Sequence, residues 1–329
     1  MTGGRSPDRD GMALLTVLVL VAVMAALAVP MLDDIRFSVR RASNAAAMTQ
    51  AQWLALGAET LARRQVERLT APDPLRTPLR PEWNGRVFDF PVEDGAVRLT
   101  VRDGQACFNL NSVVSGPDEA LSADPAGVTQ FLALARAVGV PRARAQVIAE
   151  SLVDWIDADG RPSPLGAEDG AYAAGVPAYR TGGTLLAEVS ELRAVRGVTA
   201  GDYARLRPYL CALPLAGASP INVNTLTPEQ AVLLVMMTDG RLGEGAARRV
   251  IRSRPPQGWS DPHAFWSQDA LAGAAPSDRA YDQVVVATRF FALDARVAYG
   301  GAEAVLSALI EAAPGAPVRT TARRWTLDE

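Results

Sequence analysis

The stretch GMALLTVLVLVAVMAALAVPMLDDIRFSVRR, residues 11–41, decides how this 329-residue chain is organised. The 21 residues from Met12 to Leu32 carry no charge, and as a helix they would span about 30 Å, the thickness of a bilayer's hydrocarbon core. Three interpretations compete. The stretch is a secretory signal cut near Ala26–Ala28, a simple membrane anchor, or an anchor that continues as one long helix beyond the membrane.

The residues that follow Leu32 favour the continuous helix. Apolar and small side chains recur there at alternating steps of four and three, which places them on one face of a helix. This stripe consists of Ile35, Val39, Ala42, Ala46, Thr49, Trp53 and Leu56. The first proline-rich break is TAPDPLRTP, residues 70–78, so we predict a single helix from Met12 to Leu69 that is about 87 Å long.

The N-terminus resembles the leader of type IV pilin-like precursors, in which a short polar segment ends in glycine before an apolar helix. The resemblance implies that prepilin peptidase cuts between Gly11 and Met12 and that the new amine is methylated. Such subunits usually carry a glutamate at the fifth mature position, where this chain has Thr16. Because threonine cannot neutralise the terminal ammonium of a neighbouring subunit in lipid, we expect a unique end position in a fibre.

The remainder of the chain predicts strands, then a helical block, then strands again. RVFDFPVEDGAVRLTVRDGQACFNLN, residues 86–111, is typical of β-strands with Asp-Gly turns, here at Asp94 and Asp103. Helical patterns fill residues 112 to about 279. Strand-like segments return from residue 281 onward, where AEAVLSALIEAA is ambiguous with helix. One strand-bearing domain with a helical insertion explains this order most economically.

The predicted fold class is therefore α+β: a pilin-like long N-terminal helix packs on a small antiparallel sheet that carries a large all-α insertion. The predicted segments are the leader (1–11), the transmembrane and amphipathic helix (12–70), the first strands (71–111), the inserted helical domain (112–280) and the second strands (281–329). Trp53 lies on the apolar stripe, and we expect it to pack against the protein's own sheet. Contact with partner helices is the alternative.

Composition and motifs argue against several classes of function. The net charge of −3 argues against a protein held mainly by attraction to phosphate. The single histidine, His263, nearly excludes histidine zinc sites and Ser-His or Cys-His dyads. No nucleophile elbow, P-loop or dinucleotide fingerprint accompanies the acidic residues. We therefore do not expect an enzyme.

An internal sequence repeat predicts two related helical units. CFNLNSVV at Cys107 and PINVNTLT at Pro220 share an Asn-x-Asn core, and each precedes a helix and a glycine-centred turn. The second turn, Gly243–Gly245, is followed by several arginines and is similar to a helix-hairpin-helix unit, whose backbone amides can hold a phosphate. A membrane-tethered DNA-uptake protein is therefore the alternative function. Because Glu244 puts a negative charge in this hairpin, we expect the hairpins to serve packing and not nucleic acid.

Five segments, taken in order, identify a closer family resemblance. FNLN, SLVDWIDADGRP, GAEDGAY, EVSELRAVRGVT and INVNTLTPEQAVL strongly resemble the minor pseudopilin K family of type II secretion, also called general secretion pathway protein K. The resemblance covers nearly the whole chain. It implies a subunit that caps the pseudopilus tip with minor pseudopilins I and J and performs no catalysis. It also implies a single span of the inner membrane, a periplasmic globular part, and bound calcium in the helical region.

The residues agree with calcium but do not determine its ligands. Five carboxylates fall within sixteen residues: Asp154, Asp157, Asp159, Glu168 and Asp169. Glu188 would add a sixth if its segment packs back on the loop. Ca²⁺ takes six to eight oxygen ligands and would relieve their repulsion. The spacing is not an EF-hand, because Arg161 and Pro162 stand where a ligand and a glycine are needed. The alternative is a solvated acidic loop paired with Arg161 or Arg180.

The two cysteines, Cys107 and Cys211, lie at the two ends of the first helical unit. In the periplasm, which the family resemblance implies, a disulfide becomes the favoured state of such a pair. We therefore hypothesise a disulfide across the base of this unit. It would close a loop of about a hundred residues and stabilise the fold by a few kcal/mol.

Overall fold

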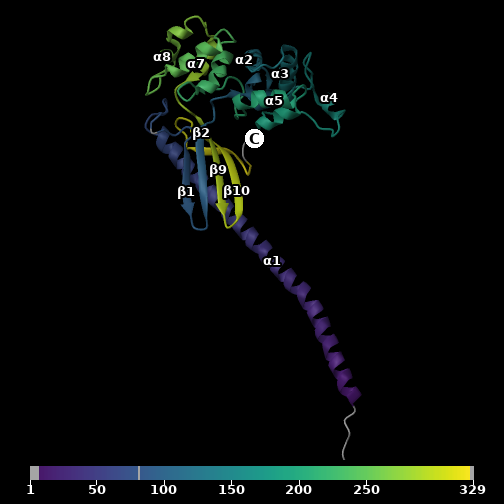
Figure 1. Cartoon of the computed structure of the whole chain (residues 1–329). Coiled ribbons are helices and arrows are strands. Elements are labelled where there is room, and N and C mark those ends of the chain that lie inside the picture. The colour runs from purple at the N-terminus through teal and green to yellow at the C-terminus, as the bar shows by residue number, and fades with distance from the viewer. Residues whose placement is uncertain (1–6, 81, 327–329) are drawn as a thin grey trace, which may run out of the picture.

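The computed structural model describes residues 7–80 and 82–326, and its dominant element is one long helix. Helix α1 runs from Pro7 to Thr70, 64 residues, without interruption. Its lower half extends as a free rod, and the described side chains up to Ala46 are all exposed (Figure 1). The prediction of a single helix reaching residue 69 is confirmed.

A five-stranded antiparallel sheet lies against the upper half of α1. Its order is β1-β2-β9-β10-β11, and every neighbouring pair is antiparallel. The strands are β1 (Val87–Val92), β2 (Gly95–Asp103), β9 (Phe290–Tyr299), β10 (Ala302–Glu311) and β11 (Arg319–Arg324). Because β2 pairs with β9, the first and last strands build one sheet, and everything between them is an insertion. The predicted α+β class is confirmed.

The ambiguous segment AEAVLSALIEAA forms strand β10. Ala304, Leu306, Ala308 and Ile310 are buried at every second position, which is the period of a strand and not of a helix. The turn before it uses Gly300 and Gly301, both with positive φ (53° and 82°), where a side chain would be strained.

A row of small residues forms the face of α1 that lies on the sheet. Ala51, Ala55, Ala58 and Ala62 are at most 2% exposed and belong to the sheet core. The expectation that Trp53 packs on this sheet is wrong, because its side chain is 65% exposed. Trp53 lies two residues after Ala51, about 200° around the helix. Alanine lets the helix approach the sheet closely, so the bulky residue lies on the other side.

The insertion is a helical block that sits at the end of the sheet opposite the lower rod of α1 (Figure 1). Its α-helices are α2 (Pro125–Ala137), α3 (Arg142–Ile156), α4 (Asp169–Ala173), α5 (Ala200–Leu206), α6 (Ala231–Met237), α7 (Glu244–Arg252), α8 (Pro262–Trp266) and α9 (Asp278–Gln283). Short 3₁₀ turns are η1 (Leu110–Val113), η2 (Asp118–Ala120), η3 (Val189–Ala194), η4 (Arg207–Tyr209), η5 (Pro228–Gln230) and η6 (Asp269–Leu271). The block has its own hydrophobic core, separate from that of the sheet.

Two similar units make up this block. In each, a short strand opens the unit and a parallel strand closes it: β3 (Phe108–Asn109) pairs with β6 (Leu210–Cys211), and β7 (Ile221–Asn222) pairs with β8 (Val284–Val285). A further two-stranded pair, β4 (Val114–Ser115) and β5 (Ser122–Ala123), is antiparallel. Helix α2 packs on α3, α6 packs on α7, and contact between α2 and α6 joins the units. The repeated Asn-x-Asn core therefore marks a repeated structure.

Asp103, the last residue of β2, joins the sheet to the helical block. Its Oδ2 accepts hydrogen bonds from the hydroxyls of Thr225 (2.7 Å) and Thr288 (2.6 Å), and its Oδ1 accepts one from the Gln105 backbone N–H. Burial raises the pKa of Asp103 to about 6, although these hydrogen bonds act in the opposite direction. One carboxylate thus connects the sheet with the start of the second helical unit and with the approach to β9.

Candidate functional site

The loop between α3 and α4 brings three acidic side chains together. Asp157 caps the C-terminal end of α3, and Glu168 is the residue immediately before α4. Asp159 lies between them, where the chain begins to fold back. One carboxylate oxygen from each of the three lies within 4.8 Å of the others. This group, which we call the acidic cluster, is the candidate metal centre.

The acidic cluster lacks a counter-charge within the described part of the chain. Burial, followed by repulsion from Asp159, Asp154 and Glu168, raises the pKa of Asp157 to about 7. Burial and the neighbouring carboxylates raise the pKa of Glu168 as well. Asp157 Oδ1 and Glu168 Oε1 are buried and have no hydrogen-bond partner among the described residues. Unpaired oxygens at this spacing fit a hard cation that prefers oxygen ligands, of which Ca²⁺ is the typical example.

The other predicted ligands have different partners. Asp154 is 1% exposed and accepts hydrogen bonds from the Ser163 backbone N–H and hydroxyl, so it holds the loop folded. Asp169 accepts from Thr181 N–H and hydroxyl, both at 2.9 Å, which closes the base of the segment 169–181. Asp154 and Asp169 therefore surround the acidic cluster without joining it.

Glu188, the sixth predicted ligand, points to a different part of the molecule. Its Oε1 lies 2.6 Å from Arg324 Nε at the end of β11, so it links the helical block to the sheet. Of the alternative ion pairs, Arg180 lies 3.9 Å from Asp169, while Arg161 donates its backbone N–H to Asp159 Oδ1 at 2.8 Å. The spacing of the six acidic residues in the sequence could not show which of them point the same way.

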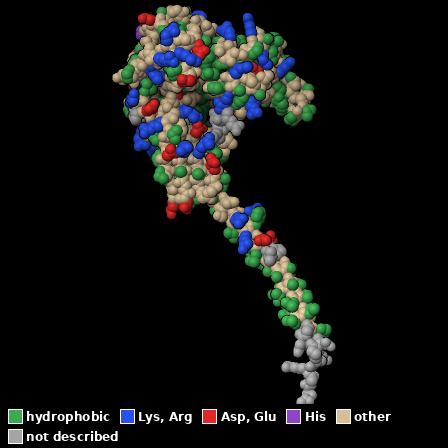
Figure 2. Space-filling model, viewed as in Figure 1, with side chains coloured by type: hydrophobic (Ala, Val, Ile, Leu, Met, Phe, Trp, Pro, Cys, Tyr) green, Lys and Arg blue, Asp and Glu red, His purple; other side chains and the backbone are tan. Residues whose placement is uncertain are grey.

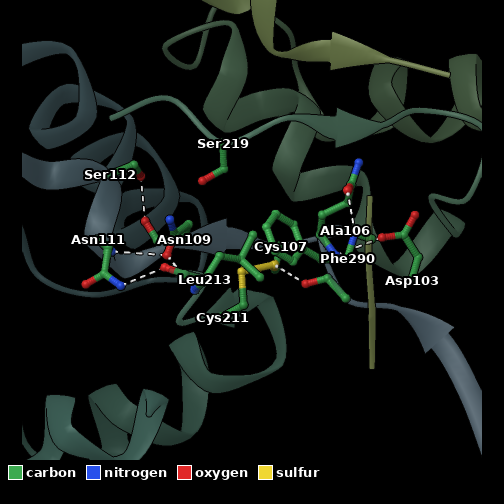
Figure 3. The surroundings of a disulfide bond; sticks show 12 residues. Asp103, Ala106, Cys107, Asn109, Asn111, Ser112, Cys211, Leu213, Ser219 and Phe290 are labelled. Atoms are coloured by element: carbon green, nitrogen blue, oxygen red, sulfur yellow. Dashed lines mark hydrogen bonds between the residues drawn. A yellow bond between two sulfur atoms is a disulfide. The ribbon is translucent and has the colours of Figure 1, made fainter. Parts of the chain in front are cut away.

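The base of the first helical unit contains the two cysteines. Cys107 and Cys211 form a disulfide with Cα atoms 5.8 Å apart and a sequence separation of 104. Beside it, Asn109 Oδ1 accepts from the Leu213 N–H at 2.9 Å, and Asn111 Nδ2 donates to the Leu213 carbonyl at 2.9 Å (Figure 3). The disulfide and the two amides hold the returning chain against the strand that opens the unit.

The second unit uses the same amide device without a disulfide. Asn222 Oδ1 accepts from the Asn224 N–H, as Asn109 does from Asn111. Asn224 then clamps Trp259, donating to its carbonyl (2.9 Å) and accepting from its N–H (2.8 Å). In the sequence the two Asn-x-Asn cores give only a repeat signal, and the clamping role of their side chains within each unit was not predicted.

The apolar part of α1 is the third functional feature. The segment Met12–Thr70 contains an 18-residue window of mean hydropathy 2.9, none of it buried, which is long and apolar enough to cross a membrane (Figure 2). The Thr16 hydroxyl donates within the helix to the Met12 and Ala13 carbonyls, so it needs no partner in lipid. Gly11 also lies within α1, whereas leader residues 1–6 lie outside the described residues.

Charged side chains in and after the hairpin of the second unit make contacts within the protein. Gly243 caps α7, and Glu244 pairs with Arg248 at 2.6 Å. Arg254 donates to the Leu226 carbonyl at 2.7 Å, and burial lowers the pKa of its guanidinium. These contacts indicate a packing role for this arginine-rich segment.

Comparison with known proteins identifies the family. Family models described as type II secretion system protein K match residues 106–215 and 221–287. The chain is 39% identical over 261 residues to type II secretion system protein K of Klebsiella pneumoniae, covering 79% of this chain and 80% of that protein. The chain belongs to the type II secretion system protein K family. A relative from Aeromonas hydrophila is 40% identical over 268 residues, with coverages of 79% and 80%.

A solved structure agrees with this membership of the protein K family. The fold matches a chain in the crystal structure of the GspK-GspI-GspJ complex from enterotoxigenic Escherichia coli, with a TM-score of 0.73 and 32% identity. The match covers 84% of this chain and 96% of that one. The protein is thus a minor pseudopilin of type II secretion, and its family is structural. The comparisons give the DNA-uptake alternative no support.

Proposed function

We propose that this pseudopilin caps the pseudopilus tip together with minor pseudopilins of the I and J types. The observation that most supports this proposal is the structural similarity, over 84% of this chain, to the protein solved in complex with GspI and GspJ. The assembly would initiate or limit the fibre that drives folded periplasmic proteins across the outer membrane.

The shape of the molecule supports a tip position. The helical block lies at the end farthest from the apolar rod of α1 (Figure 1), where a further subunit stacked on the sheet would meet it. Thr16 stands where shaft subunits have a carboxylate, and its hydroxyl is already bonded within α1. A subunit without that carboxylate cannot neutralise a neighbour's terminal ammonium, so it is poorly suited to repeat along the shaft. Both features suit a subunit used once, at the end.

The proposed location is the inner membrane, with one span and the globular part in the periplasm. The exposed apolar segment of α1 would be the span. A disulfide such as Cys107–Cys211 persists in oxidising compartments, which supports a periplasmic location. In this scheme prepilin peptidase cuts between Gly11 and Met12 and the new N-terminus is methylated. Mass spectrometry of the mature chain tests both steps, since it must begin with a methylated Met12.

Calcium is the proposed ligand of the acidic cluster. Asp157, Asp159 and Glu168 would hold it, because their oxygens converge and two of these are buried without partners. A bound Ca²⁺ supplies positive charge that offsets the repulsion among the carboxylates. Asp154 would keep its present bonds to Ser163 and so hold the loop in position.

Co-purification from membranes tests the proposed function. The full chain, tagged at its C-terminus, is expressed with the I and J subunits and purified with either calcium or a chelator present. We expect I and J to be retained with calcium, and secretion to be restored in cells that lack their own protein K. A chain that restores secretion without retaining either subunit would overturn the proposed assembly.

A further inference from the structure

A pocket lies where the proline-rich segment after α1 meets the second helical unit. Its volume is about 340 Å³, which is within the range of sites that hold small ligands. One wall belongs to the segment that leads from α1 into the sheet, and the others belong to the turn after β7 and to the chain that follows α7. We call it the junction pocket, and its lining includes Leu79, Arg80, Glu82, Trp83, Arg254 and Pro255.

The neutral polar side chains in the walls of the junction pocket are committed to bonds within the protein. Asn224 donates to the Trp259 carbonyl and accepts from the Trp259 N–H. The Thr225 hydroxyl donates to the Asp103 carboxylate. Asn84 accepts from the Asp103 N–H and donates to the Thr225 carbonyl. The charged side chains therefore decide what the pocket can bind.

Arg254 is a partly buried cation in this wall. Its Nη1 donates to the Leu226 carbonyl at 2.7 Å, which is the hydrogen bond that the guanidinium makes among the described residues. A guanidinium has five N–H donors in a planar fork, so most of its donors remain open. Burial lowers the pKa of Arg254, and no carboxylate in the described part of the chain forms an ion pair with it. Buried charges are normally paired, so this cation lacks the counter-charge that its position calls for.

Arg80 adds a second cation on the exposed side of the junction pocket. Within the described ranges, Arg80 forms neither a hydrogen bond nor an ion pair. Glu82 is the one carboxylate among the described lining residues, and it is exposed and pairs with neither arginine. Two arginines and one glutamate leave one positive charge, which suits an anion that carries a single negative charge.

A second pocket continues the first along the proline-rich segment. Its volume is about 300 Å³, and it shares Leu79 and Arg80 with the junction pocket. Arg76 and Asp73 both line it, so it adds no net charge, and Pro78 contributes apolar surface. The two pockets form a groove that is larger than a free carboxylate such as acetate needs. An extended chain fits this groove better than a free small acid does.

We infer that the junction pocket binds an extended acidic segment of another protein chain, with a carboxylate of that segment paired with Arg254. The guanidinium fork can hold both oxygens of one carboxylate, which fixes the orientation of the bound chain. A doubly charged phosphate would be repelled more strongly by Glu82 than a carboxylate is. The inference goes beyond the proposed function and does not require it, because the partner is defined only by its charge and its extended form.

Peptide binding to the full chain in a neutral detergent tests this inference. Saturation-transfer NMR at low ionic strength measures the dissociation constant of the capped peptide Ala-Pro-Glu-Ala-Asp-Ala, and Ala-Pro-Gln-Ala-Asn-Ala is its uncharged match. We expect the acidic peptide to bind at least about tenfold more tightly than the uncharged peptide, acetate or inorganic phosphate. Equal binding of the two peptides would overturn the inference. Binding of acetate or inorganic phosphate as tight as that of the acidic peptide would overturn it as well.

Substitutions of two neighbouring arginines locate the binding. Arg254→Met should weaken binding of the acidic peptide at least about tenfold, because it removes the partly buried cation. Arg252→Met is the matched control, since Arg252 is exposed on α7, does not line the pocket and changes the net charge equally. Unchanged binding in Arg254→Met, or an equal loss in Arg252→Met, would refute the assignment to Arg254.

A substitution at Glu82 tests the site without disturbing the bond between Arg254 and Leu226. Because Glu82 is exposed, Glu82→Gln should leave the fold intact. It removes the carboxylate that competes for the arginines, so the acidic peptide should bind about two- to fivefold more tightly. The uncharged peptide should show no such gain. Unchanged or weaker binding of the acidic peptide in Glu82→Gln would contradict the inference, even if Arg254→Met failed to fold.

Discussion

Glu59 of α1 and Arg323 of β11 form a two-point ion pair that fastens the last strand to the long helix. Arg323 Nε lies 2.6 Å from Glu59 Oε2, Nη2 lies 2.9 Å from Oε1, and the carboxylate is only 4% exposed. Burial acts to raise the pKa of Glu59, but the hydrogen bonds from Arg323 and Thr320 outweigh it and the pKa is lowered. The sheet edge is therefore held by charge as well as by its strand ladder.

Removing Arg323 should destabilise the fold. Arg323→Ala leaves the Glu59 carboxylate buried without its cation, which we expect to cost about 2–3 kcal/mol of unfolding free energy, since Arg323 is itself partly exposed. Chemical denaturation measures the loss. Adding Glu59→Gln to this variant should recover part of it. Arg98→Ala breaks the exposed pair with Asp89 and should leave stability unchanged. Equal losses for Arg98→Ala and Arg323→Ala would contradict this account.

Asp103 should make the fold more stable as the solution becomes mildly acidic. Its folded pKa is about 6 and its ordinary value is 3.8, so above pH 6 the folded state bears the cost of a buried charge. Protonation relieves that cost as pH falls through 6, adding about 1 kcal/mol between pH 7 and pH 5. The measurement compares unfolding free energies at the two pH values, in chelator, for the unsubstituted chain and Asp103→Asn. The increment should be missing from Asp103→Asn, and an identical pH dependence would refute the assignment.

Calcium should raise the unfolding temperature through the acidic cluster. At a concentration 100-fold above its dissociation constant, a ligand stabilises the folded state by about 2.7 kcal/mol. Asp159→Asn removes an exposed member of the acidic cluster and should abolish most of the calcium-dependent shift measured by calorimetry. Asp282→Asn, an exposed carboxylate elsewhere, is the control and should keep the shift. A full shift in Asp159→Asn would remove that residue from the ligand set.

Loss of the disulfide should weaken the first helical unit. The bond closes a loop with a sequence separation of 104, which in the loop-entropy model corresponds to about 4–5 kcal/mol. We expect Cys107→Ser with Cys211→Ser to lower the unfolding free energy by up to that amount and to make stability insensitive to reductant. A thiol assay on non-reduced periplasmic protein checks the premise, because two free thiols would mean that the bond does not form.

The sequence predicts the large elements of this fold well, because their signals are local. The long uninterrupted helix follows from the apolar run and from the absence of proline-rich breaks before Thr70. The strands before and after the helical block were predicted from turn signals and strand-like composition. Strand β10 was ambiguous because its alanines suit a helix as well as a strand. Pairing with β9 and contact with α1 decide between the two.

The orientation of α1 and the details of its sites depend on distant contacts. Spacing shows that Ile35 and Trp53 share a face, but not which neighbour that face meets. The alanine row that lies on the sheet gives no hydrophobic signal of its own. In the same way, the acidic residues show a common charge but not a common direction, and Glu188 turns to Arg324, which is far along the chain.

The pairing of β2 with β9 has a consequence for the order in which the chain can fold. The helical block separates these two strands, so the sheet stays unfinished until the final strands have been synthesised. Until then the alanine row of α1 lacks β9 and β10, the two strands that pack most extensively on the helix, and only β2 is present to cover it. If translation ended shortly before β9, the product would be a membrane-tethered α1 and a helical block, with no complete sheet between them. Such a product would expose the same alanine surface to proteases and to other unfinished chains.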